Sequence, residues 1–119
     1  QYYSLFEQNN LIALGTDFPV EEINPLNTFY AAVFRKNKLG EPIGGFQKNQ
    51  SLSRNQAIRG MTIWAALANF EENEKGSLEI GKSADMVILN RDILKIPEKD
   101  ILNSKVLKTI IDGEIVFSD

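Results

Sequence analysis

Apolar residues at the start of the chain form an unbroken run, and this pattern predicts a buried strand. Residues 11–14 read Leu-Ile-Ala-Leu and lead directly into Gly15, Thr16 and Asp17. A strand with one face in solvent would alternate apolar with polar residues, whereas a continuous run is typical of a strand covered on both faces. We therefore expect a buried strand at residues 11–14 that ends in a turn carrying Asp17.

The next stretch has the spacing of an amphipathic helix. Asn24 can cap the free backbone N–H groups, and Pro25 suits the first helical position because its missing N–H is not needed there. The apolar positions that follow share one face: Leu26, Phe29, Tyr30, Val33 and Phe34. A face this wide predicts a helix that packs against a large apolar surface and stops before Gly40.

A second helix is predicted behind Ser53. The side chains of Ser53 and Gln56 can each bond the other's backbone N–H, which forms a capping box. The residues expected on one face of this helix are Ala57, Met61, Trp64 and Ala68. Between the two helices, residues 40–45 contain three glycines and a proline, so they predict a loop.

From Gly76 onward the period changes to that of strands. Residues 86–89 form a second apolar run, and Asp112-Gly113 lies between two runs rich in β-branched residues. This pair is a strong hairpin signal because both turn positions favour positive φ. Residues 97–103 read as a loop or a short helical turn. No internal repeat is visible.

Composition excludes several classes of function. The 119 residues carry 13 Lys and Arg against 16 Asp and Glu, a net charge of −3, with no Cys and no His. Mild acidity gives no electrostatic footprint for nucleic acid or an anionic membrane, so we expect a small-molecule substrate and neither of those partners. No apolar run approaches the roughly 20 residues of a membrane helix. The lack of Cys is compatible with a cytoplasmic location, which is the one expected.

Asp17 is the main candidate for chemistry, and other interpretations stay open at this stage. An Asp after a strand also caps turns through local hydrogen bonds. Asp17, Glu21 and Glu22 could bind calcium but lack the spacing of a calcium loop. Thr16 has no histidine or other evident base to activate it, and the glycines of residues 40–45 lack the Gly-Lys-Ser/Thr ending of a phosphate loop.

Four stretches together resemble the C-terminal end of the amidohydrolase superfamily, in the metal-dependent family 3 branch of YtcJ-like proteins. The stretches are "ALGTDFPVEEINPL", "FYAAVFRKNKLGEPIGGF", "LSRNQAIRGMTIWAALANFEENEKGSLEIGKSADMVILNRD" and "VLKTIIDGEIVF". The resemblance covers almost the whole chain, and "GTDFPV" and "KGSLEIGKSADMVILNRD" are its most specific parts. The matching order suggests a fragment of a larger enzyme, as does a chain that begins at Gln1.

The resemblance implies an α/β fold in two parts. Residues 1–75 would form the last strand and following helices of a (β/α)₈ TIM-like barrel, and residues 76–119 the C-terminal strands of a small β-sandwich. Barrel active sites lie at the C-terminal ends of the strands, where Asp17 would then be placed. The resemblance makes Asp17 a catalytic residue and a metal ligand, or the acceptor of the water proton. It identifies no substrate-binding residue. Asp85, before a sandwich strand, is expected to be a structural turn residue.

The missing histidines limit what this chain can do alone. Superfamily members bind their divalent metal, here expected to be zinc, largely through histidines on earlier strands, which this sequence lacks. We therefore expect no metal bound to the fragment and no activity without the rest of the protein. Two hypotheses remain: a piece of a metal-dependent hydrolase of C–N (amide or cyclic amide) bonds, or a non-catalytic structural or interaction module. The first also predicts exposed apolar surface that can associate into homo-oligomers.

Overall fold

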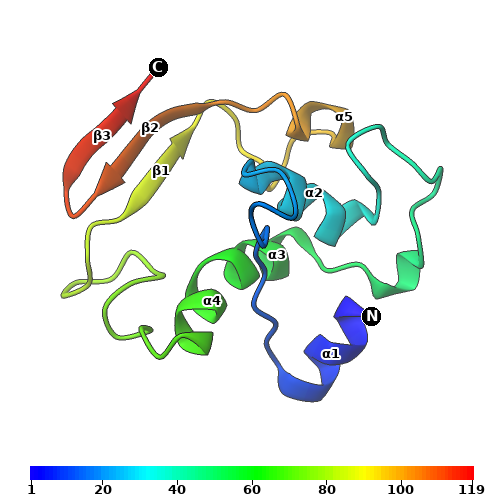
Figure 1. Ribbon diagram of the computed structural model, residues 1–119, viewed down its shortest axis with the longest axis horizontal. Helices are drawn as coiled ribbons and strands as arrows, with labels where there is room; N and C mark the ends of the chain where they lie inside the picture. Colours follow the sequence, from blue (N-terminus) through cyan, green and yellow to red (C-terminus); the bar gives the residue numbers. More distant parts are fainter.

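The computed structural model describes residues 1–119 as a group of short helices with a small sheet at one side (Figure 1). The chain measures 41 × 35 × 29 Å along its principal axes. In order, the elements are α1 (Tyr2–Asn9), α2 (Pro25–Phe34), a 3₁₀ turn (Lys48–Gln50), α3 (Arg54–Met61), α4 (Ile63–Ala68), β1 (Met86–Leu89), α5 (Glu98–Ile101), β2 (Val106–Ile111) and β3 (Glu114–Ser118). The chain is thus a small α/β unit.

Helix α2 forms where the sequence predicts it and supplies most of the core. The Asn24 side chain accepts a hydrogen bond from the backbone N–H of Leu26, and Pro25 occupies the first turn. The helix ends at Phe34, and Arg35 follows in the left-handed conformation. Its buried side chains join others from beyond the helix in one cluster: Leu26, Phe29, Tyr30, Ala32, Val33, Leu52, Ala57, Ile93 and Ile101.

The second predicted helix exists, but it is broken in two. The capping box of Ser53 and Gln56 is confirmed at the start of α3. The chain then leaves the helical conformation at Thr62, with φ −126° and ψ −100°, before α4 begins. The Thr62 hydroxyl donates to the carbonyl of Ile58, a side-chain bond that competes with regular helix and often bends it. The single face expected from Ala57 to Ala68 is therefore wrong, and Ala68 is exposed.

The C-terminal strands form a three-stranded antiparallel sheet in the order β1-β2-β3. The hairpin between β2 and β3 is confirmed, with Asp112 at φ 51° and Gly113 at φ 82°, as a turn with two positive φ angles requires. Strand β1 pairs with β2 on its other edge. Every residue of β3 is exposed, and so are several apolar residues of the other strands: Val87, Ile88, Leu107 and Ile111.

The predicted strand at residues 11–14 is absent from this structure. The segment is irregular, its three leucine and isoleucine side chains are half-buried, and Ala13 is exposed. Its backbone makes one hydrogen bond to the rest of the chain, from the Leu14 N–H to the carbonyl of Gly60. The prediction fails because a strand needs a neighbouring strand to complete its ladder, and the three strands of this chain pair only with each other.

The two parts divided near residue 75 share side-chain contacts. Ile93 and Ile101, from the second part, lie in the same buried cluster as Phe29 of α2. The guanidinium of Arg54 donates to the carbonyls of Ile93 and Ile96 at 2.8 and 2.7 Å. The boundary between residues 75 and 76 stays a prediction. Separately, none of the helices combines the length and apolar character needed to cross a membrane.

Phe29 should carry far more stability than an exposed phenylalanine. Its side chain has 0% exposure, whereas Phe70 is 93% exposed. We expect Phe29→Ala to lower the free energy of unfolding by about 3–5 kcal/mol through lost burial and a residual cavity, and Phe70→Ala by less than about 0.5 kcal/mol. Urea denaturation followed by circular dichroism measures both. Equal losses in the two variants would contradict this description of the core.

Candidate functional site

Asp17 lies in an exposed turn at the end of the half-buried segment 11–14. Its backbone has φ 50°, and its carbonyl accepts a hydrogen bond from the N–H of Val20 at 2.8 Å. The Asp17 residue is exposed, and its carboxylate forms no hydrogen bond or ion pair. The prediction that a turn carries Asp17 is therefore confirmed, and its carboxylate is free to bind a partner from outside the chain.

The residues of this chain do not by themselves fit a complete metal centre. No group of three His, Cys, Asp or Glu side chains is close enough to hold an ion. Asp17, Glu21 and Glu22 are near in sequence but do not converge, and Glu22 is already paired with Lys38. The calcium alternative is thus unsupported, and Asp17 could supply at most one ligand to a centre whose other ligands come from elsewhere.

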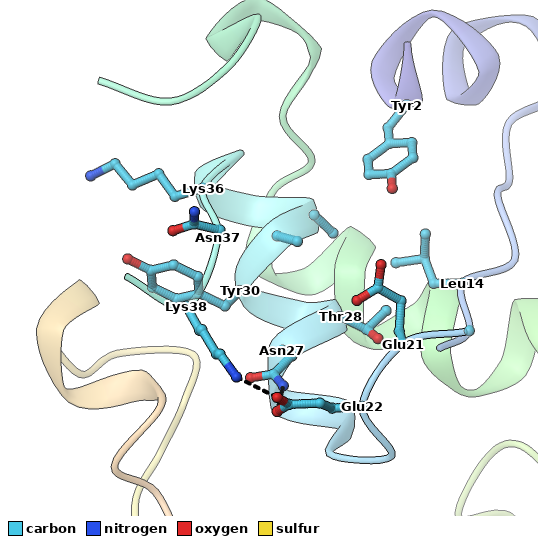
Figure 2. Close-up of a pocket in the computed structure, with 13 residues that line it drawn as sticks. Tyr2, Leu14, Glu21, Glu22, Asn27, Thr28, Tyr30, Lys36, Asn37 and Lys38 are labelled. Carbon is cyan, nitrogen blue, oxygen red and sulfur yellow. Dashed lines mark hydrogen bonds and ion pairs between the residues drawn. The ribbon is translucent and has the colours of Figure 1, made fainter. Parts of the chain in front are cut away.

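The largest cleft, of about 530 Å³, lies beside α2 (Figure 2). One wall is the segment at Leu14 and Gly15, and the other is α2 with the turn that follows it. Charged and polar side chains line much of it, including Glu21, Glu22 and Lys38. Asp17 is not among the lining residues, so the main sequence candidate and this cleft are separate features.

An ion pair spans the mouth of this cleft. The Glu22 carboxylate accepts hydrogen bonds from Lys38 Nζ and, at 3.2 Å, from Asn27 Nδ2. Figure 2 shows Lys38 and Asn27 both directed at Glu22. The hydrogen bond from Lys38 holds the pKa of Glu22 below its usual range. Because the pair is exposed and its members are mutually satisfied, it acts as a rim contact and leaves no reactive group there.

A second polar group is more buried and joins α2 to α5. The Tyr30 hydroxyl donates to Glu98 Oε1 at 2.9 Å, and Lys36 Nζ reaches the same oxygen at 2.7 Å. Burial, followed by the neighbouring Glu98 carboxylate, raises the pKa of Tyr30 to about 12. The Lys36 hydrogen bond lowers the pKa of Glu98. Sequence reasoning missed this group because Tyr30 and Glu98 are 68 positions apart and no local pattern links them.

The remaining sequence candidates have structural explanations. Asp85 Oδ1 accepts from the backbone N–H of Asp112 at 2.8 Å, and the carbonyl of Ala84 accepts from the N–H of Gly113 at 3.1 Å. Asp85 is therefore a turn residue, as predicted, and it holds both amides of the hairpin turn together with Ala84. Trp64 is buried and stacks on Phe6 with ring centroids 5.6 Å apart, so its predicted packing role is also confirmed.

Comparison with known proteins identifies a family. The amidohydrolase family matches residues 4–117. N-substituted formamide deformylase of Arthrobacter pascens is 28% identical over 96% of this chain and 20% of its own length. Protein LONG AFTER FAR-RED 3 of Arabidopsis thaliana is 35% identical over 98% of this chain and 19% of its own. Putative amidohydrolase YtcJ of Bacillus subtilis is 28% identical over 96% and 22%. The chain thus spans about a fifth of these relatives. No solved structure matches it.

The buried Tyr30 should make stability depend on alkaline pH. Its pKa rises from 10.0 to about 12 on folding, so its contribution is complete below pH 10 and is lost as the pH rises to about 12. We expect the free energy of unfolding, measured by urea denaturation at about pH 8 and about pH 11.5, to fall less between these values in Tyr30→Phe than in the unsubstituted chain.

The control for this measurement is Tyr3→Phe. Tyr3 is exposed, and its hydroxyl makes no hydrogen bond in the structure. Lysines also titrate in the same range, but they do so equally in both variants. Tyr3→Phe should therefore keep the full pH dependence. An unchanged pH dependence in Tyr30→Phe would show that the Tyr30 hydroxyl is not held as described.

Proposed function

This chain belongs to the amidohydrolase family, in its family 3 branch, and we propose that it is part of a larger metal-dependent hydrolase that cleaves C–N bonds of amides or cyclic amides. The observation that carries the proposal is the match over residues 4–117, in a chain whose exposed Asp17 follows the half-buried segment 11–14. The hydrolase class rests on the family. The C–N bond, the metal and the role of Asp17 are the proposed parts.

The role we assign to Asp17 is that of a single carboxylate in a centre completed by residues outside this sequence. Such a carboxylate can take up the proton released when water attacks an amide carbonyl and pass it to the leaving nitrogen. It can also serve as one oxygen ligand of a divalent metal, expected to be zinc. Within residues 1–119 it has no partner to complete either arrangement, so we propose that the chain alone is inactive.

The position of Asp17 suits this role if residues 11–14 become a strand in the longer protein. The segment now has one backbone hydrogen bond to the rest of the chain, so most of its N–H and C=O groups are free to pair. We propose that strands from elsewhere in the protein flank it as the last strand of a (β/α)₈ barrel. Asp17 would then lie at the C-terminal end of that strand, where barrel active sites occur. A cytoplasmic location and a small-molecule substrate also stay predictions.

The direct test is substitution of Asp17 in a longer protein that contains this sequence. Asp17→Asn keeps the shape of the side chain but removes its charge and its capacity to hold a proton. We expect kcat/KM for amide substrates to fall on the order of 100-fold or more. Asp119→Asn, at an exposed position outside the proposed site, is the matched control and should retain activity. Turnover near the unsubstituted level in Asp17→Asn would remove the catalytic assignment.

The proposal also predicts that the isolated chain associates with itself. Val87, Thr109 and Phe117 lie opposite one another across the three strands, and both apolar members of this row are exposed. We propose that another part of the longer protein covers this row. Without that cover, exposed apolar surface promotes self-association, so sedimentation should show dimers or larger species that increase with concentration.

Two substitutions localise this association. A Val87→Thr and Phe117→Thr double variant should reduce it, because it makes the exposed row polar while keeping residues that favour strands. Ile43→Thr changes an apolar residue that is also exposed but lies alone in a loop, and it should leave association unchanged. A monomer at all concentrations would favour the alternative function, an independent structural module.

A further inference from the structure

Gly60, in the last turn of α3, lies directly against residues 11–14. A Cβ atom built at Gly60 would stand 2.8 Å from the backbone oxygen of Ile12 and 2.9 Å from Cγ and Cδ1 of Leu14. These separations are shorter than van der Waals contact, so any side chain at position 60 would displace the segment. The absence of a side chain is what allows the two backbones to approach.

The same residue also binds the segment through its backbone. The Gly60 carbonyl accepts a hydrogen bond from the Leu14 N–H at 2.9 Å. Because α3 ends at Met61 and the chain leaves the helix at Thr62, this carbonyl belongs to the last turn, whose carbonyls lack intrahelical partners. The break in the helix therefore makes an acceptor available at the one place where the helix surface is low enough for Leu14 to reach it.

This contact fixes the chain immediately before the turn of Asp17. Only Gly15 and Thr16 separate Leu14 from Asp17, and the turn itself is closed by the hydrogen bond from Val20 N–H to the Asp17 carbonyl. Figure 1 shows the blue segment that leads to this turn passing α3. Any shift of Leu14 must therefore move Asp17 as well.

We propose that Gly60 is the positioning residue for the turn that carries Asp17, acting through its carbonyl bond to Leu14 and through its lack of a side chain. The proposal rests on the proposed function for the importance of Asp17, whereas the geometry itself does not. It also explains a helical position that otherwise opposes local preference. Alanine is the better helix former, yet glycine stands at position 60, which is buried and is not in the left-handed region.

The test compares Gly60→Ala with the unsubstituted 119-residue chain by nuclear magnetic resonance. We expect hydrogen exchange at the Leu14 amide to accelerate about tenfold, because its hydrogen bond is lost or stretched. The amide resonances of Thr16 and Asp17 should shift as the turn moves. Asn55→Ala is the matched control, since Asn55 is exposed on the same helix and also becomes a better helix former, and it should leave these signals in place.

A second variant separates displacement of the turn from general damage to the helix. Leu14→Ala in the Gly60→Ala background removes the two short side-chain contacts and leaves only that with the Ile12 oxygen. The Thr16 and Asp17 resonances should then move back towards their original positions. A weakened helix alone would give no such recovery.

The proposal is overturned if the Leu14 amide is unprotected in the unsubstituted chain, or if Gly60→Ala leaves its exchange rate and the Asp17 resonance unchanged. These readouts do not depend on catalysis. An active Asp17→Asn enzyme would end the proposed function while leaving the positioning result intact. Unchanged resonances in Gly60→Ala would end the positioning proposal while leaving the activity assignment of Asp17 to its own test.

Discussion

The burial of Phe29 is the interaction around which the helical part is assembled. This side chain is fully buried, and residues from α2, from the start of α3, and from the segments at Ile93 and Ile101 meet in the same cluster. Close packing of this kind fixes the relative positions of its members because interiors leave little free volume. Ile12 and Leu14 pack at the border of the cluster. The segment that precedes Asp17 is therefore held by the core on one side and is unpaired on the other.

The sequence predicted those elements whose cause is local. Asn24 and Pro25 define the start of α2, Ser53 and Gln56 bond each other at the start of α3, and Asp112-Gly113 forms the turn that its φ preferences require. Each depends on residues within a few positions of one another, so a linear pattern contains the necessary information. Such signals are reliable because capping and turn geometry involve few alternatives.

The predictions that failed depend on partners far away in the sequence. Residues 11–14 have the composition of a buried strand, but composition cannot supply the neighbouring strands that would bond to it. Thr62 breaks a helix that propensity alone would continue, since its hydroxyl finds the carbonyl of Ile58. The contact between Tyr30 and Glu98 has no local signal at all. For the candidate site, the sequence indicated Asp17 and its turn, whereas the contact of Leu14 with Gly60 became visible only in three dimensions.

The attachment of the hairpin turn to Ala84 and Asp85 has a practical consequence for engineering. Hairpin tips are usually good places to insert a tag or a reporter domain, because their amides face solvent and their loss costs little. Here both turn amides are occupied, by the Asp85 carboxylate and the Ala84 carbonyl, so lengthening the turn would also release the residues that lead into β1. The loop around Ile43 and Gly44 is exposed and has open space around the glycine, which makes it the better insertion point.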